Sequence, residues 1–240
     1  MFPATIFDFN GVLVDDELVH RDAFRDVLSP LGVFFTDEQY TERYLGFDDL
    51  GALRAMLIDA GRTATDAEIA ELARAKQPFY MGRAEQSLIV FPGAADLVRA
   101  RARLGPVGIV SGALRNEIAF ALRNMKLEDA VSFVVSADET PRCKPDPMGY
   151  ERAIELLTDK MGDRHARHSL VIEDSLAGIQ SAKAAGLACL AVAHSYSEEQ
   201  LLAAGADAVT GHISAVDDVL LSALHRKLRG SGEALSSSSS

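Results

Sequence analysis

Short apolar runs alternate with longer amphipathic stretches along most of this chain, and this alternation constrains its fold more than any other feature. The apolar runs, typical of strands buried on both faces, are residues 4–14, Val107–Val110, Phe133–Val135, Leu170–Ile172 and Cys189–Val192. The stretches with helical periodicity between them are Ala94–Leu104, Asn116–Met125, Met148–Leu157, Ser175–Ala185 and Glu198–Ala204. Strands that alternate with helices predict an α/β fold with a doubly wound, Rossmann-like parallel sheet.

Residues 15–86 follow a different pattern. Their amphipathic stretches at Leu18–Leu31, Asp48–Ala60 and Thr65–Met81 are not interrupted by any strand-like run. We therefore expect an all-helical cap domain inserted after the first strand. The α/β core domain would comprise residues 1–14 and 87–229, and the serine-rich residues 230–240 would form a flexible tail.

The charge balance narrows the choice of partners. The chain has 24 basic and 35 acidic residues, a formal net charge of -11. An acidic chain repels nucleic acid and anionic lipid, so we expect neither nucleic acid nor a membrane as partner. Only two cysteines are present, and no secretory leader pattern opens the sequence. These features favour a cytoplasmic protein, which we expect to be a monomer or a weak homodimer.

Four polar segments carry chemistry, and each lies where a predicted strand ends or on a loop nearby. These segments are Asp8-Phe9-Asn10-Gly11, Ser111-Gly112, Lys144-Pro145-Asp146-Pro147 and Glu173-Asp174-Ser175. Ligands of open α/β sheets bind in the crevice outside the carboxyl ends of the strands. We therefore expect the four segments to converge on one site.

Three carboxylates in one crevice, from Asp8, Glu173 and Asp174, cannot all stay ionised unless a cation joins them. Oxygen-only ligands favour Mg²⁺ over zinc. The cation would recruit phosphate oxygens, and Ser111 and Lys144 suit the remaining ones. One carboxylate could then attack phosphorus and form an aspartyl-phosphate. The expected partner is a small phosphorylated metabolite.

In this order, the four segments resemble the haloacid dehalogenase superfamily. They are most similar to its helical-cap members of the β-phosphoglucomutase-like and phosphoglycolate-phosphatase-like groups. The resemblance covers about residues 3–220 and implies that Asp8 is the nucleophile and a Mg²⁺ ligand. It also implies that Asp174 is a second ligand and that Glu173 is a ligand directly or through water.

The resemblance implies further roles for residues around the phosphoryl group. Ser111, Gly112 and Lys144 would bind the transferring group, and the backbone carbonyl of Asn10 would bind Mg²⁺. The substrate-binding residues would also include Arg115, on the turn after Ser111, and two residues of the cap. These cap residues are His20 and Lys76, the lysine of the returning cap helix.

Asn10 departs from the family pattern, in which phosphatases and mutases have an aspartate as general acid and base. An amide cannot exchange that proton, and the loss of a positioned acid or base typically costs about 10²–10⁴-fold in rate. Three explanations are open. Asn10 is an engineered substitution, or a natural variant that uses a better leaving group or another base such as His20 or Glu17. Alternatively, the protein is a slow or binding-only member of the family.

The loop at residues 44–49 bears on the substrate. Its sequence, Tyr-Leu-Gly-Phe-Asp-Asp, lacks the basic residues with which the sugar-phosphate mutases of the family hold a second phosphate. The favoured hypothesis is therefore a Mg²⁺-dependent phosphohydrolase of a small phosphate monoester. A sugar-phosphate mutase and a non-catalytic phosphometabolite-binding protein are the alternatives, and phosphonate cleavage through Lys76 is a more remote one.

Overall fold

The computed structural model describes the backbone of residues 1–237 and the side chains of residues 1–230. The chain divides into two compact units. One comprises Met1–Leu13 together with the chain from Val90 onward, and the other comprises Val14–Ile89. The boundaries expected from the sequence, at residues 15 and 86, differ from this division by a few residues. Two short strands, β2 (Val14–Asp15) and β3 (Ile89–Val90), pair where the chain passes from one unit to the other.

A six-stranded parallel sheet forms the centre of the first unit. Its strands run in the order β5-β4-β1-β6-β7-β8. Their bounds are β1 Thr5–Phe7, β4 Val107–Val110, β5 Phe133–Val135, β6 Leu170–Glu173, β7 Ala188–Val192 and β8 Ala208–Thr210. Ile6 of the central strand lies opposite Gly108 on one side and Val171 on the other. All carboxyl ends therefore meet at the same edge of the sheet.

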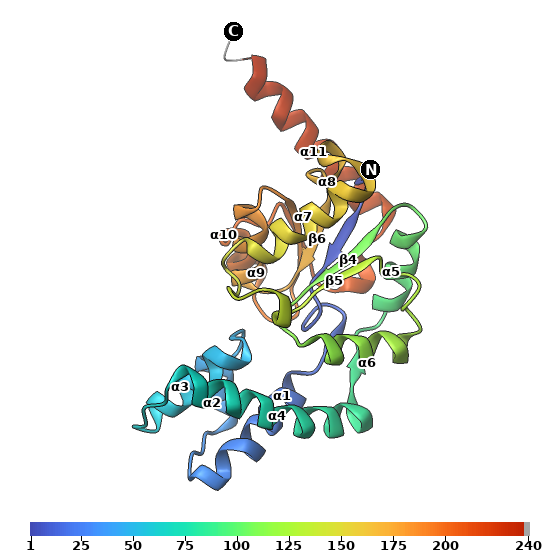
Figure 1. The fold of residues 1–240 in the computed structure, drawn as a ribbon. Helices are drawn as coiled ribbons and strands as arrows, with labels where there is room; N and C mark the ends of the chain where they lie inside the picture. The colour runs from blue at the N-terminus through green and yellow to red at the C-terminus, as the bar shows by residue number, and fades with distance from the viewer. Residues whose placement is uncertain (238–240) are drawn as a thin grey trace. The chain divides into compact units, whose positions relative to one another are not determined.

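Helices cover both faces of this sheet (Figure 1). They are α5 Ala94–Ala102, α6 Arg115–Met125, α7 Met148–Met161, α8 Asp163–Ala166, α9 Leu176–Ala184, α10 Glu198–Ala203 and α11 Asp218–Ser237. Tyr150 of α7 and Ile179 of α9 pack in one apolar cluster with Ile6 and Val171 of the strands. On the opposite face, the guanidinium of Arg101 in α5 donates to Thr5 Oγ1 at 2.8 Å. The predicted doubly wound α/β fold is confirmed.

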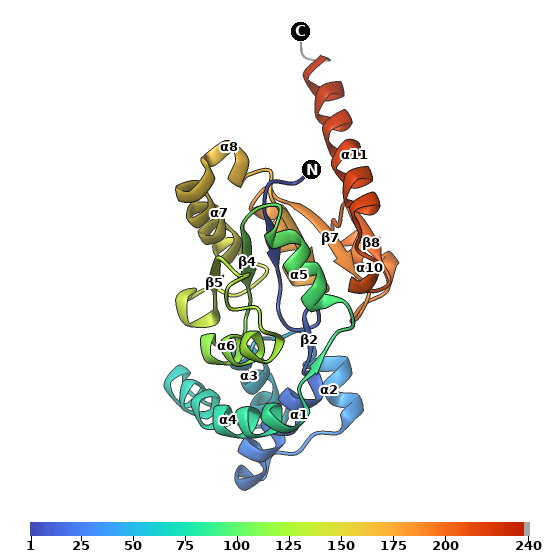
Figure 2. The same cartoon turned by 90° about the vertical axis from the view of Figure 1, so that its right-hand side faces the viewer.

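The differences from the predicted elements have local causes. Within the apolar run at residues 4–14, β1 ends at Phe7; the chain then turns at Gly11, which has a φ of 73°, and Val14 begins β2. Strand β8 and helix α11 were not predicted, and Figure 2 shows α10 and α11 beside β7 and β8. The expected tail at residues 230–240 starts within α11, and residues 238–240 lie outside the described residues. Among the described residues, no helix combines the length and apolar character that a membrane span requires.

The second unit is helical, as expected. Its helices are α1 Glu17–Leu28, α2 Asp37–Arg43, α3 Asp49–Asp59 and α4 Asp66–Ser87, with a 3-10 turn at Ser29–Leu31. The short helix α2 was not predicted; it begins at a capping box in which Thr36 and Gln39 bond each other's backbone. Buried side chains from α1, α2 and α3, among them Phe24, Tyr40 and Leu53, form a separate apolar core.

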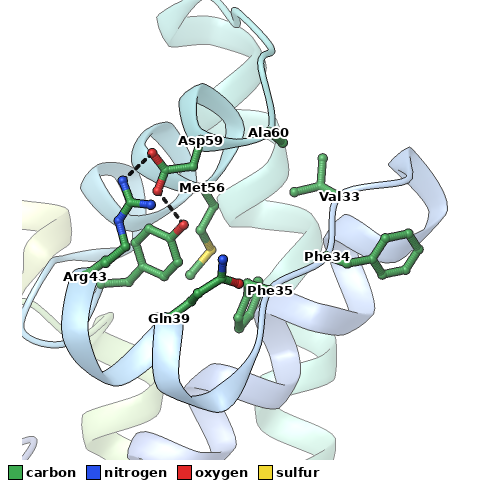
Figure 3. Close-up of a pocket in the computed structure, with 9 residues that line it drawn as sticks. Val33, Phe34, Phe35, Gln39, Arg43, Met56, Asp59 and Ala60 are labelled. Carbon is green, nitrogen blue, oxygen red and sulfur yellow. Dashed lines mark hydrogen bonds and ion pairs between the residues drawn. The ribbon is translucent and has the colours of Figure 1, made fainter.

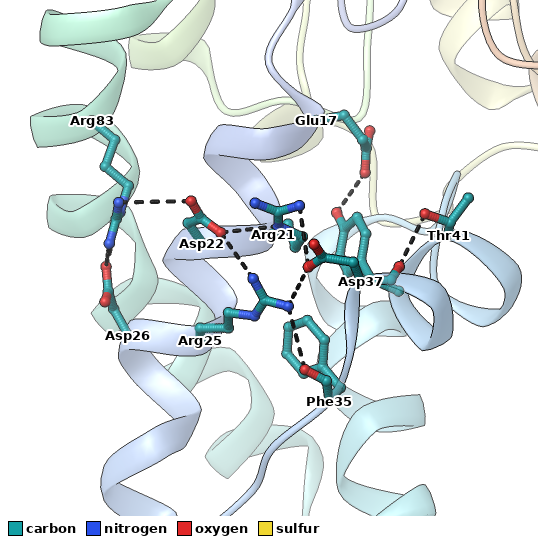
Figure 4. A network of polar contacts seen from close by, with 10 residues as sticks. Glu17, Arg21, Asp22, Arg25, Asp26, Phe35, Asp37, Thr41 and Arg83 are labelled. Atoms are coloured by element: carbon teal, nitrogen blue, oxygen red, sulfur yellow. Dashed lines mark hydrogen bonds and ion pairs between the residues drawn. The ribbon is translucent and has the colours of Figure 1, made fainter.

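Polar contacts surround this helical core. Arg25 and Arg21 both pair with Asp22 and Asp37, which ties α1 to the start of α2 (Figure 4).

A cavity of about 80 Å³ lies between α2 and α3 (Figure 3). Asp59, one of the residues that line this cavity, accepts hydrogen bonds from Arg43 at 2.7 Å and from the Tyr44 hydroxyl at 2.6 Å. These polar contacts lie around the apolar core of the helical unit, and several of them are exposed.

Candidate active site

The carboxyl ends of two adjacent strands bring three acidic side chains together. Asp8 follows β1, Glu173 is the last residue of β6, and Asp174 follows it. Each of the three offers a carboxylate oxygen, and these oxygens lie within 4.8 Å of one another. All three residues are buried, with at most 6% of the residue surface exposed. The convergence expected from the sequence is thus present at the centre of the sheet.

Lys144 bridges two of these acids. Its Nζ donates to Asp8 Oδ1 at 2.6 Å and to Glu173 Oε1 at 2.5 Å. The same ammonium lies 5.5 Å from the centre of the Tyr150 ring. Lys144 lies on the loop before α7, so that loop supplies a positively charged ammonium group to the acidic cluster.

Glu173 is held by more donors than any other acid of the cluster. Its Oε1 accepts from Lys144 and from the Tyr150 hydroxyl, the latter at 3.0 Å. Its Oε2 accepts from the backbone N–H groups of Asp174 and Ser175 and from the Ser175 hydroxyl, at 3.0 to 3.1 Å. A side chain at Gly178 would collide with this carboxylate, because its Cβ would lie 1.7 Å from Oε1. Glu173 therefore anchors Lys144, and Asp8 and Asp174 are the acids less occupied by other contacts.

The Ser111 hydroxyl contacts the side-chain amide of Asn10, two residues after Asp8. The Ser111 hydroxyl, at the end of β4, donates to Asn10 Oδ1 at 3.1 Å and accepts from the Ala113 backbone N–H at 3.0 Å. Gly112, between Ser111 and Ala113 in the sequence, is exposed. The predicted phosphate-binding segment is therefore next to the motif that carries Asp8.

Burial and like charge set the protonation of the cluster. Burial raises the pKa of Asp8 to about 7, although the Lys144 ammonium opposes the shift. Burial, together with the Glu173 and Asp8 carboxylates, raises the pKa of Asp174 well above its usual range. Lys144 lowers the pKa of Glu173 against the effect of burial. One ammonium thus serves three acids, and a divalent cation bound by oxygen atoms would stabilise their charged forms. The carboxylate oxygens of this cluster are ligands that fit Mg²⁺.

Arg115 lies apart from these contacts. Its guanidinium donates to the Val134 carbonyl at 2.9 Å and to Glu139 Oε1 at 2.5 Å, and its backbone N–H donates to Asp138. These bonds tie α6 to the segment after β5. A contact between Arg115 and a substrate stays a prediction, and none of these bonds supports it.

His20 and Lys76 belong to the helical unit. Lys76 is fully buried, which excludes a solvated surface lysine. Its ammonium donates to Asp49 and lies 2.7 Å from His20 Nδ1. His20 Nε2 lies 3.3 Å from Asp16, which also accepts from the Tyr80 hydroxyl at 2.5 Å. The substrate-binding roles of His20 and Lys76 stay predictions.

Glu17, the other residue that the sequence suggested as a base, is engaged elsewhere in the helical unit. Its Oε1 accepts from the Tyr40 hydroxyl at 2.5 Å. A role of Glu17 as a base therefore stays a prediction.

Sequence reasoning missed two residues that follow β7. The Ser195 hydroxyl donates to Asp174 Oδ2, and the His194 ring lies 2.7 Å from the Gly11 carbonyl oxygen. A signal for both was present, since β7 is a core strand and its carboxyl end lies at the edge where the other site residues gather. The pattern of acidic and basic residues in the sequence does not indicate either of them.

Comparisons with known proteins agree on the family. The model of the haloacid dehalogenase-like hydrolases matches residues 2–186. Protein CbbY of Cereibacter sphaeroides is 29% identical over 214 residues, which cover 86% of this chain and 90% of that protein. Phosphoglycolate phosphatase of Rhodospirillum rubrum is 29% identical over 227 residues, which cover 90% of each chain.

A solved structure agrees with these two relatives. It is an asparagine-for-aspartate mutant of CbbY from Rhodobacter sphaeroides in complex with xylulose-(1,5)bisphosphate. Its TM-score is 0.75 at 25% identity, and the match covers 90% of this chain and 96% of that one.

Proposed function

This chain belongs to the haloacid dehalogenase-like hydrolases, and from that premise we propose that it is a Mg²⁺-dependent phosphatase of a small phosphate monoester. The observation that carries the proposal is the buried Asp8 carboxylate, bonded to Lys144 beside two further acids. The relatives named above support the substrate class, because one of them is a phosphoglycolate phosphatase and another was obtained with a sugar bisphosphate.

In the first proposed step, an Asp8 carboxylate oxygen attacks phosphorus and forms an acyl phosphate, while the bond from phosphorus to the ester oxygen breaks. The leaving alcohol oxygen takes a proton from water. The Lys144 ammonium and the Ser111 hydroxyl bind oxygens of the transferring group and offset its charge. Bound Mg²⁺, held by Asp8, Asp174 and the Asn10 carbonyl with Glu173 directly or through water, would supply Lewis-acid stabilisation of that group.

In the second proposed step, a water molecule attacks the acyl phosphate, inorganic phosphate leaves and the Asp8 carboxylate is restored. Lys144 keeps Asp8 oriented in both steps, because it is itself fixed by Glu173. The arrangement therefore needs no group other than Asp8 to carry the phosphoryl group.

Asn10 limits the rate of both steps. Its amide can accept a hydrogen bond from Ser111, but it can neither give a proton to the leaving oxygen nor take one from water. Substrates whose leaving group needs no proton should therefore form the acyl phosphate fastest. The same residue favours a second candidate function, a protein that binds a phosphorylated metabolite and does not turn it over.

Phosphate release from a panel of esters, with and without Mg²⁺, tests the proposal. The panel should include phosphoglycolate, sugar phosphates, a pentulose bisphosphate and an aryl phosphate with a good leaving group. We expect Mg²⁺-dependent release that Asp8→Asn abolishes, and a mass increase of one phosphoryl group on Asp8 in quenched samples. Tight binding without any release over hours would select the binding protein instead.

A further inference from the structure

The loop after β7 reaches two parts of the site at once. Ser195 donates its hydroxyl proton to Asp174 Oδ2, and the neighbouring His194 lies 2.7 Å from the carbonyl oxygen of Gly11. Gly11 directly follows the Asn10 carbonyl that the proposed function assigns to Mg²⁺. Two consecutive residues therefore contact both the second acid of the cation site and the loop that follows the nucleophile.

The state of the His194 ring follows from its partners. The backbone N–H of Ile213 donates to Nε2 at 3.3 Å, so Nε2 carries a lone pair. Nδ1 then holds the ring proton and donates it to the Gly11 carbonyl oxygen. The ring also stacks on Phe91, with 4.0 Å between the ring centres and 20° between the planes. These three contacts fix the ring in one orientation.

Gly11 and Asp174 lie against each other, which makes their mutual position critical. A Cβ at residue 11 would lie only 2.1 Å from Asp174 Oδ2, the oxygen that Ser195 holds. The φ of Gly11 is 73°, in the left-handed region that glycine adopts most readily. His194 thus holds the backbone on one side of this contact, and Ser195 holds the carboxylate on the other.

Asp174 depends on Ser195 for orientation. Lys144 gives its bonds to Asp8 and Glu173, and within residues 1–230 the Ser195 hydroxyl is the one donor recorded for the Asp174 side chain. Outer partners that orient a ligating side chain typically change metal affinity by about 10–100-fold when removed. Ser195 has the geometry of such a partner.

We propose that His194 and Ser195 are positioning residues that orient Asp174 and the Gly11 peptide for the cation. This inference rests on the proposed Mg²⁺ site, and it adds residues that neither the motifs nor the comparisons assign. It predicts that loss of the Ser195 hydroxyl weakens cation binding without removing any ligand.

Direct binding of Mn²⁺ to the substrate-free protein, followed by electron paramagnetic resonance, tests the proposal. We expect Ser195→Ala to weaken Mn²⁺ binding about 10–100-fold and Ser195→Thr, which keeps the hydroxyl, to restore most of it. The matched control is Ser197→Ala, which removes a hydroxyl of the same loop that accepts from the Gln200 backbone at the start of α10. This control should bind Mn²⁺ as the unmodified protein does.

The outcomes separate this inference from the proposed function. If neither the unmodified protein nor the variants bind Mn²⁺, the cation site itself fails. If the unmodified protein binds and Asp174→Asn does not, while Ser195→Ala binds with unchanged affinity, only the role of Ser195 is overturned. His194→Phe keeps a ring to stack on Phe91 and loses the bond to Gly11, so unchanged affinity in that variant overturns the role of His194. Melting temperatures measured in EDTA identify any variant that fails to fold.

Discussion

Introducing an aspartate at position 10 should convert a slow enzyme into a fast one. Asn10→Asp replaces an amide by a carboxyl group of nearly the same shape, so the Ser111 hydroxyl, now 3.1 Å from Oδ1, keeps its acceptor. The new side chain can exchange protons with the leaving oxygen and with water. A positioned acid or base contributes about 10²–10⁴-fold, or roughly 3–5 kcal/mol of barrier.

The size of the gain should depend on the leaving group. We expect the full gain in kcat/KM for an alkyl phosphate, because kcat/KM reports the first step, in which the alkoxide must be protonated as it leaves. The attack of water in the second step is common to all substrates and does not enter this ratio. For p-nitrophenyl phosphate the gain should be less than about tenfold, because that leaving group is stable without a proton. Steady-state phosphate release with both substrates, at saturating Mg²⁺, measures the two ratios.

A matched control isolates the chemistry from the change in charge. Asn124→Asp places the same substitution on an exposed turn of α6 and should leave both rates unchanged. Equal gains on the two substrates would contradict the proton-transfer reasoning. So would an absence of any gain in a variant that still binds Mg²⁺ and ligand.

Two further perturbations test the electrostatics of the two units. The pKa of Asp8 is about 7 in the folded chain and 3.8 ordinarily, so without a cation its contribution to stability is greatest below pH 4 and is lost as the pH rises to 7. The urea-unfolding free energy in EDTA should therefore fall by up to about 4 kcal/mol between pH 4 and 8 from Asp8 alone, and Mg²⁺ should reverse the fall. Burial also raises the pKa of Asp174, so Asp8→Asn should lessen the fall without abolishing it, and an undiminished fall in that variant would refute this cause. In the helical unit, Asp49→Ala leaves the buried Lys76 ammonium without its carboxylate and should cost about 2–4 kcal/mol, less than a fully buried pair because Asp49 is 24% exposed. Adding Lys76→Met should recover most of that loss, and strictly additive losses in urea unfolding would show that the two groups are not coupled.

The sequence predicted the parts of this protein that depend on local pattern. The strand that precedes Asp8 and the one that ends at Glu173 are apolar on both faces, and the rule for parallel sheets then placed their acids at one edge. The family resemblance added their expected order along the chain. For that reason, the convergence of Asp8, Glu173 and Lys144 could be predicted from the sequence.

Contacts that depend on tertiary packing could not be predicted from the sequence. The burial of Lys76 requires knowledge of which helix packs over it, and its partners Asp49 and His20 lie in other helices. Ser195 lies beyond the last apolar residue of β7, in a loop with no charge pattern to mark it. Arg115 shows the same limit: its position after Ser111 suggests a substrate contact, which stays a prediction, whereas its bond to Glu139 depends on tertiary packing.

The five donors around Glu173 have a consequence for how this position tolerates change. Glutamine is usually a mild replacement for glutamate, but three of these donors, the Lys144 ammonium and the backbone N–H groups of Asp174 and Ser175, cannot accept a hydrogen bond. In either of its two flips, an amide would turn its NH₂ group toward at least one of these three groups. Position 173 should therefore favour glutamate over glutamine, although the two side chains have nearly the same shape, because only the carboxylate accepts hydrogen bonds at both of its ends.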